Sequence, residues 1–129
     1  MKSAVSLYDD LEPKSEYYDR RSGLSKEEYF DRLKVSTTLY IGNLSFFTPE
    51  HQLLELFSQC GRVVNLIMGL NKQNNLPCGF CFVEYTTRAE ATLAIDLLNH
   101  ASIDGRLIRV DWDYGFEPSR RYGRGKEGG

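Results

Sequence analysis

Hydrophobic residues follow two different periods along the middle of the chain. Four segments are alternating or rich in β-branched and aromatic residues, which is typical of strands. These predicted strands cover 37–41, 63–68, 79–85 and 107–112. Two other segments carry apolar residues at helical spacing: one begins with Thr48 as its N-cap and ends at Gly61, and the other follows a capping box made by Thr87 and Glu90.

The order of these elements is βαββαβ. It predicts a ferredoxin-like α+β fold in which two helices cover one face of a four-stranded antiparallel sheet and the other face is open. We place this domain at 37–114. Residues 1–36 are highly charged and are predicted to be a flexible extension with one short helix, capped by Ser25. Residues 115–129 are rich in Gly and Arg and are predicted to be a flexible tail.

Strand alternation places three aromatic side chains on the open face. Cys81 and Val83 suit packing against helices, so Phe80 and Phe82 should point outward, joined by Tyr40 from the first strand. Such a surface forms a platform for nucleic-acid bases, worth roughly 1–3 kcal/mol per stacked base. Alternatively, a terminal segment covers the two phenylalanines, which is compatible with stacking once a ligand arrives.

The fourth strand adds charge to the same face. Alternation puts Arg109, Asp111 and Asp113 beside the rings, although Asp is depleted in strands. A carboxylate can accept hydrogen bonds from N1–H and from the exocyclic amine of guanine. Methylation at N7 makes that base cationic, so stacking between two rings gains a cation–π attraction. The strand therefore favours a cationic, donor-rich base as the ligand.

The distribution of charge along the chain indicates where phosphates could bind. The whole chain carries −2, which argues against a bulk electrostatic nucleic-acid binder. Residues 117–129 have four Lys or Arg against two Glu, whereas residues 37–116 have five against eight. Phosphate binding is therefore expected from the tail.

Other functional classes find little support. Cys78 and Cys81 have zinc-like spacing, but a strand turns the two sulfurs to opposite faces and no second pair of ligands completes a site. We predict no metal and no cofactor. No stretch reaches the roughly 20 apolar residues of a membrane span, so we expect no membrane association. His51 and His100 have no apparent nucleophile partner, so we predict no catalytic residues and no enzyme activity.

Two motifs resemble those of the RNA recognition motif family. Residues 39–44, Leu-Tyr-Ile-Gly-Asn-Leu, resemble RNP2, and residues 78–85, Cys-Gly-Phe-Cys-Phe-Val-Glu-Tyr, resemble RNP1. Cys78 stands where RNP1 usually has a basic residue, which implies weaker generic contact with the RNA backbone. The resemblance implies the same βαββαβ fold.

Over a longer span, the chain resembles the small subunits of the nuclear cap-binding complex, which bind the 7-methylguanosine cap of RNA polymerase II transcripts. The matching stretches include 38–46, 67–70, 78–85, 111–116 and 122–126. By this resemblance Tyr40 is one ring of a base sandwich and Tyr17 the other, with Tyr18 as an alternative. The resemblance implies further roles around the base and next nucleotide for Phe80, Phe82, Arg109, Asp111, Trp112 and Asp113, and roles at the triphosphate for Arg120 and Arg124.

The same resemblance implies partners and a location. The expected partners are capped RNA and a large helical-repeat subunit, which would dock on the helices of the domain and order both terminal segments. The expected location is the nucleus, with shuttling to the cytoplasm, and the expected roles are in pre-mRNA processing, splicing and export. Two alternatives remain: a generic RNA recognition motif for single-stranded RNA, as in a splicing factor, and one used for protein interaction.

Overall fold

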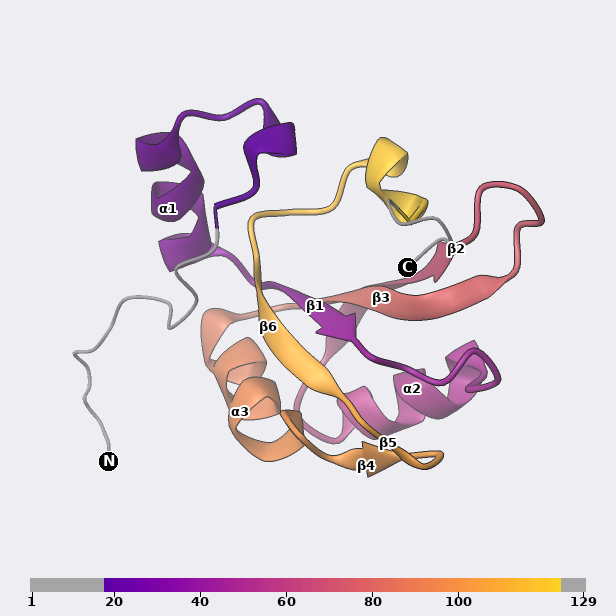
Figure 1. Ribbon diagram of the computed structural model, residues 1–129. Coiled ribbons are helices and arrows are strands. Elements are labelled where there is room, and N and C mark those ends of the chain that lie inside the picture. The colour runs from indigo at the N-terminus through magenta and orange to yellow at the C-terminus, as the bar shows by residue number, and fades with distance from the viewer. Residues whose placement is uncertain (1–17, 124–129) are drawn as a thin grey trace.

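The computed structural model describes residues 18–123, which form one sheet of four strands, a short hairpin and three α-helices (Figure 1). The helices are α1 (Lys26–Val35), α2 (Glu50–Ser58) and α3 (Arg88–Leu98), with short 3-10 helices η1 (Arg20–Ser22) and η2 (Pro118–Arg121). The strands are β1 (Thr38–Gly42), β2 (Val63–Leu70), β3 (Pro77–Tyr85), β4 (Ser102–Ile103), β5 (Arg106–Leu107) and β6 (Arg109–Asp113).

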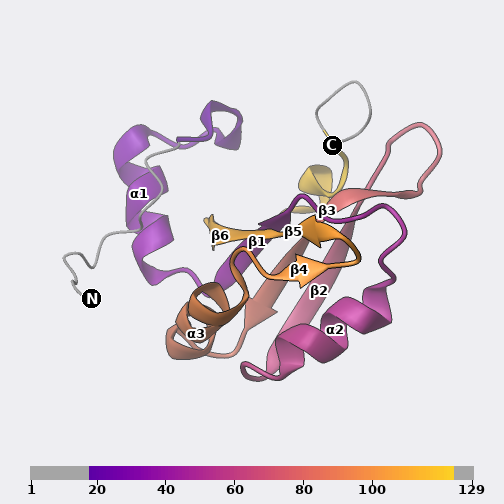
Figure 2. The ribbon, with the colours of Figure 1, turned by 60° about the horizontal axis from the view of Figure 1, so that its bottom comes forward.

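The main sheet has the strand order β2-β3-β1-β6, and its paired strands are antiparallel. Helices α2 and α3 lie together on one face, whereas α1 stands apart beyond the end of the sheet (Figure 2). This arrangement confirms the predicted ferredoxin-like fold.

The core lies between the sheet and the helices α2 and α3. Alternate residues of the central strands point into it, as the hydrophobic pattern predicts. Its fully buried members include Leu39, Ile41, Leu53, Phe57, Cys81, Val83, Ala91 and Ala94. The rigid sheet that results fixes where the side chains on the opposite face can lie.

Two of the three α-helices begin as the sequence predicts. Ser25 and Glu28 form a capping box at α1, and Thr87 and Glu90 form one at α3. The predicted cap of α2 is wrong, because Pro49 is the N-cap and supplies no side-chain hydrogen bond. The hydroxyl of Thr48 instead donates to Asp104 Oδ2 at 2.7 Å, so a long-range acceptor replaces the local one.

The predicted fourth strand is divided in the structure. Its first part pairs locally, in the hairpin of β4 and β5, and only β6 joins the main sheet. Asp104 and Gly105 turn this hairpin with φ values of 49° and 83°, the backbone that a tight two-residue turn needs. Strand β6 runs one residue further than predicted, to Asp113.

The segment after β6 returns across the open face of the sheet. Gly115, with φ of 135°, turns the chain there, and η2 follows. Gly123 N then donates to Leu70 O at 3.1 Å, at the end of β2. Residues 115–123 of the predicted flexible tail are therefore built against the domain, while residues 124–129 lie outside the described part.

Candidate functional site

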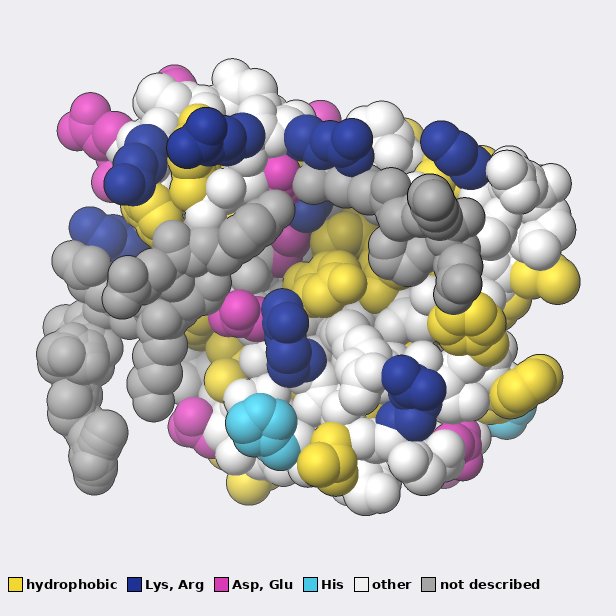
Figure 3. Space-filling model, in the orientation of Figure 1, with side chains coloured by type: hydrophobic (Ala, Val, Ile, Leu, Met, Phe, Trp, Pro, Cys, Tyr) yellow, Lys and Arg dark blue, Asp and Glu magenta, His cyan; other side chains and the backbone are white. Residues whose placement is uncertain are grey.

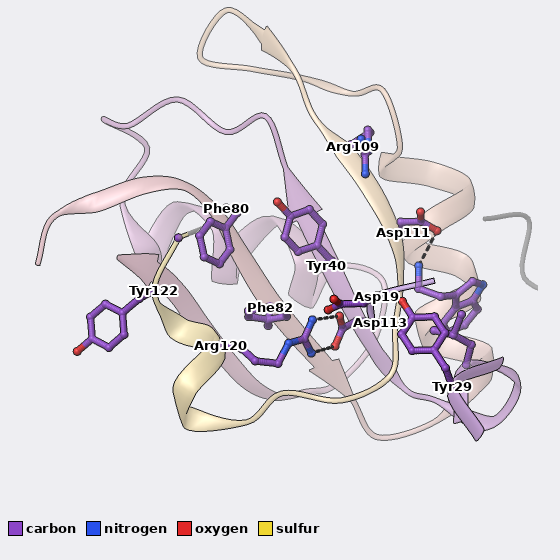
Figure 4. Close-up of a pocket in the computed structure, with 13 residues that line it drawn as sticks. Asp19, Tyr29, Tyr40, Phe80, Phe82, Arg109, Asp111, Asp113, Arg120 and Tyr122 are labelled. Carbon is purple, nitrogen blue, oxygen red and sulfur yellow. Dashed lines mark hydrogen bonds and ion pairs between the residues drawn. The ribbon is translucent and has the colours of Figure 1, made fainter. Parts of the chain in front are cut away.

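A cavity of about 480 Å³ lies on the open face, between the sheet, α1 and the returning C-terminal segment (Figure 4). Cavities of roughly 300–1,000 Å³ are typical of small-ligand sites. The lining residues are Asp19, Tyr29, Leu33, Tyr40, Phe80, Phe82, Arg109, Asp111, Trp112, Asp113, Arg120, Tyr122 and Gly123. Seven of the residues picked out from the sequence for the open face and β6 are thus gathered at one site, together with Arg120.

The floor of the cavity is aromatic. Tyr40 on β1 lies opposite Phe82 on β3 and Asp111 on β6, so the strand register brings all three side chains to one face. The ring centroid of Tyr40 is 5.7 Å from that of Phe80 and 5.8 Å from that of Phe82. Burial raises the pKa of the Tyr40 hydroxyl above its ordinary value of 10, so this ring is uncharged at neutral pH.

The two phenylalanines face the predicted side but are covered. Phe80 is 6% exposed and Phe82 only 2%. Phe116 packs on Phe82 with ring centroids 5.2 Å apart. The prediction that both rings are exposed is therefore wrong. For Phe82 the alternative prediction holds, because the C-terminal segment covers its ring. Hydrophobic side chains still show at the centre of this face, bordered by acidic and basic ones (Figure 3).

Asp113 and Arg120, which both line the cavity, form a buried ion pair beside its aromatic floor. The guanidinium donates through Nη1 and Nη2 to the two carboxylate oxygens, each at 2.7 Å, and through Nη1 to Gly115 O at 2.6 Å. It also lies 4.2 Å from the ring centroid of Tyr114. Burial opposes the charge of Arg120, but the hydrogen bonds and charge of Asp113 outweigh it and raise its pKa. Arg120 thus ties the C-terminal segment to β6.

Asp111 has different surroundings. Its Oδ1 accepts a hydrogen bond from Trp112 N at 2.8 Å, and the half-buried carboxylate lines the cavity beside Tyr40 and the exposed Arg109 (Figure 4). The backbone bond fixes the direction of the carboxylate. This corner combines an uncharged ring, a carboxylate and a cation, which suits a polar aromatic ligand.

The side chain of Trp112 occupies an edge position. Residue 112 lies opposite Leu39, whose side chain is in the core, and its ring packs against the core and against α1. The guanidinium of Arg88 lies over it, 3.6 Å from its ring centroid. Trp112 therefore joins the cavity wall to the body of the domain.

Sequence reasoning missed the wall contributed by the N-terminal segment. Asp19, 4% exposed, and Tyr29, 5% exposed, line the cavity together with Leu33. Tyr29 and Leu33 are four residues apart in a predicted helix, so the sequence could have indicated that they share a packed face. It could not have indicated what packs against that face. Tyr29 packs on Tyr114, which is distant in the sequence, with ring centroids 5.2 Å apart.

Three expected site residues have other outcomes. Tyr18 packs in the N-terminal aromatic cluster, 5.2 Å from Tyr29 between ring centroids, and donates its hydroxyl to Leu24 O, so it does not line the cavity. Tyr17 and Arg124 lie outside the described residues. The choice of Tyr17 as the second stacking ring stays a prediction.

A second hollow, of about 310 Å³, lies beside the cavity. Arg21, Lys72 and Arg120 are among its lining residues, together with Glu117. Cys78 and Cys81 lie in separate clusters on opposite faces of the sheet. Within residues 18–123 no His, Cys, Asp or Glu side chains gather in a group that could hold a metal ion. In the same part of the chain, none of the helices has the length and apolar character needed to cross a membrane.

Comparison with protein families gives a direct match. The profile of the RNA recognition motif matches residues 39–109. Nuclear cap-binding protein subunit 2 of Drosophila ananassae is 56% identical over 115 residues, covering 89% of this chain and 75% of the fly protein. The Gallus gallus protein of the same name is 53% identical, covering 89% of this chain and 68% of its own length. The Dictyostelium discoideum one is 50% identical over 91% of this chain, which spans half of that relative.

Solved structures agree on the fold. The RNA recognition motif of Rna15 with bound RNA matches with a TM-score of 0.58 and 26% identity, over 65% of this chain and 89% of that one. The RNA-binding protein PG1 matches with a TM-score of 0.60 and 28% identity, over 64% of this chain and 99% of that one.

Proposed function

Because the chain belongs to the RNA recognition motif family and, within it, to the nuclear cap-binding protein subunit 2 family, we propose that its cavity binds the 7-methylguanosine cap of RNA. The observation that carries the proposal is the corner formed by Tyr40 and Asp111. An uncharged ring and an oriented carboxylate meet there at the edge of a cavity of about 480 Å³.

The chemistry of this corner fits a methylated guanine. The base is flat and cationic, so it gains a cation–π attraction of up to about 2 kcal/mol over each desolvated ring. Tyr40 supplies one ring, and Tyr17 is the proposed second one. Asp111 accepts hydrogen bonds from the N–H groups of the base, while its charge attracts the cation. A carboxylate that would repel ordinary RNA thereby favours this ligand.

Two sets of cations could bind the phosphates of the cap: Arg109, which lines the cavity, and Arg21 and Lys72, which line the neighbouring hollow. Arg124 would extend this basic surface. Arg120 is already hydrogen-bonded to Asp113 and Gly115 and so connects the C-terminal segment to β6. Its proposed contact with a phosphate would be an additional role.

The proposed partner is a large helical-repeat subunit that binds the outer faces of α2 and α3. Leu54, Leu93 and Leu97 are 41%, 43% and 61% exposed on those helices. Exposed apolar side chains on two helices of the same face favour a protein interface there (Figure 2). We place the assembled protein in the nucleus, with shuttling to the cytoplasm and roles in pre-mRNA processing, splicing and export.

Competition between capped and uncapped RNA tests the function. Two RNAs of one sequence, differing only in the 5′ cap, would be titrated against the chain with and without the large subunit. We expect a preference for capped RNA of about tenfold or more, since a cation–π contact contributes up to about 2 kcal/mol and a hydrogen bond to a charged group about 1.5–3 kcal/mol. Equal binding of both RNAs would support the generic single-stranded RNA function instead.

A further inference from the structure

One wall of the cavity comes from a helix that has few contacts of its own to hold it. Helix α1 has ten residues, of which only Tyr29 and Leu33 are buried. Isolated helices shorter than about 12–15 residues are marginal in water. Since Tyr29 and Leu33 both line the cavity, the shape of the site depends on whatever keeps α1 against the domain.

Arg88, the first residue of α3, adds a polar connection to the packing of Tyr29 on Tyr114. Its Nη1 donates to Leu33 O, near the end of α1, and to Ser36 O at 2.9 Å, just beyond it. These carbonyls belong to the negative end of the helix, where a cation is favoured. Among the described residues no carboxylate lies within ion-pair distance of this guanidinium, so backbone carbonyls and an aromatic ring receive its charge.

The same guanidinium links α1 to the strand that carries the carboxylates. Its central carbon lies over the Trp112 ring, 3.6 Å from the ring centroid. Trp112 stands between Asp111 and Asp113 in β6. A second tie reinforces the joint, because Ser36 Oγ donates to the backbone oxygen of Asp113 and accepts from Thr38 N at 2.9 Å.

The backbone around Arg88 is held in place as well. The capping box of α3 encloses it, with Thr87 N donating to Glu90 Oε1 at 3.0 Å and Glu90 N donating to Thr87 Oγ1 at 3.3 Å. Arg88 does not line the cavity. It can therefore influence a ligand only through the elements that it holds together.

We propose that Arg88 is a positioning residue of the site, which clamps α1 onto Trp112 so that the N-terminal wall closes on the cavity. A lysine cannot replace it fully, because an ammonium group can donate to the carbonyls but cannot lie flat on the indole. The proposal rests on the proposed function only for the choice of ligand in its test.

The test compares Arg88→Met and Arg88→Lys with Arg106→Met in the full chain. Arg106 is a matched control, because it also bridges distant segments, donating to Asn43 O at 3.2 Å and to Asn43 Oδ1 at 2.6 Å, and it does not line the cavity. The first readout needs no ligand: the rate of tryptic cleavage at the exposed Arg32 and Lys34 of α1. Arg88→Met should raise this rate about tenfold, Arg88→Lys less, and Arg106→Met should leave it unchanged.

The second readout is the ratio of affinities for 7-methyl-GTP and GTP, followed by the fluorescence of Trp112, the chain's only tryptophan. A purely structural defect would lower both affinities equally. Loss of the wall should lower the ratio about threefold or more, because the proposed second ring, Tyr17, directly precedes the segment that forms this wall and supplies part of the cation–π attraction. If Arg88→Met fails to fold, Arg88→Lys carries the comparison.

Unchanged cleavage of α1 in the Arg88 variants would overturn the proposal, and so would an unchanged affinity ratio in a chain that discriminates the two nucleotides. If the unmodified chain, assembled with its large subunit, binds 7-methyl-GTP and GTP equally, the proposed function fails. The cleavage rates would still decide whether Arg88 holds α1.

Discussion

Asp111 and Asp113 are two residues apart on one face of one strand, yet their surroundings differ. Asp113 is 5% exposed and holds Arg120 in a bidentate ion pair. Asp111 is half-buried at the cavity edge, oriented by the backbone N–H of Trp112. Alternation alone gives both the same role. In the structure both line the cavity, but the carboxylate of Asp113 is engaged by Arg120, which ties the C-terminal segment to β6.

Asp111→Asn should therefore weaken 7-methyl-GTP binding without unfolding the protein. The amide loses the negative charge and one acceptor, and a hydrogen bond to a charged group contributes about 1.5–3 kcal/mol, so we expect affinity to fall about tenfold or more. Glu84→Gln is the matched control, since Glu84 lies opposite Thr38 on the same sheet and does not line the cavity. Equal losses in the two variants would mean that general charge, not Asp111, attracts the ligand.

Gly69 is a second position where one atom matters. A Cβ there would meet ring atoms of Phe80 at 2.4 Å, so the phenyl ring of the cavity floor fits only because β2 has no side chain at this position. Gly69→Ala should force the ring aside and lower the free energy of unfolding by about 1–3 kcal/mol. Urea denaturation measures this, with Val64→Ala on the same strand, 59% exposed, as the control. No change relative to the control would show that Phe80 moves at no cost.

Helix α3 is the element on which both the core and the α1 joint depend, and its start is held by Glu90. This carboxylate accepts from Arg62 N and from Thr87 N, each at 3.0 Å. The backbone hydrogen bond from Arg62 is the main cause that lowers the pKa of Glu90 below its ordinary value of 4.5. A carboxyl group whose pKa is lower in the folded protein than in the unfolded chain stabilises the fold at pH values above its unfolded pKa. This stabilisation is lost as the pH falls through the folded pKa.

Glu90→Gln should accordingly lower the thermal midpoint at pH 7, with the difference from the unmodified chain shrinking as the pH falls below the ordinary glutamate pKa of 4.5. Thermal unfolding at several pH values checks this. Glu55→Gln, an exposed position within α2, should show no such convergence. A difference for Glu90→Gln that stays constant down to about pH 2 would argue against a role for the ionised carboxylate.

The helices and strands of the domain could be predicted from the sequence because the patterns that indicate them are local. A capping box spans four residues, and alternation is visible within one strand. The packing of the terminal elements could not be predicted in this way. Tyr29 packs on Tyr114 and Arg88 reaches the end of α1, and nothing in the residues near Tyr29 or Arg88 indicates those distant partners. The covering of Phe82 by Phe116 is of the same kind.

At the scale of the whole molecule, the cavity on the open face and the exposed leucines on α2 and α3 lie on opposite faces of the sheet in the described part of the chain (Figure 2). If the latter bind a large subunit, Leu97→Asp should weaken the heterodimer about tenfold or more, because interface centres tolerate unpaired charge poorly. Titration calorimetry against the large subunit measures this. Leu107→Asp, with a leucine equally exposed at 60% but on β5, should have little effect; a reversed order would place the interface at the hairpin.

Discrimination between 7-methyl-GTP and GTP is the most direct test of the proposed ligand, because the two nucleotides differ by one methyl group and the positive charge that it brings. Both would be titrated into the chain assembled with its large subunit, at one pH and salt concentration. A base held between Tyr40 and a second ring, beside Asp111, predicts an affinity about tenfold or more higher for 7-methyl-GTP. Equal affinities would contradict the assignment of this cavity to a cationic base.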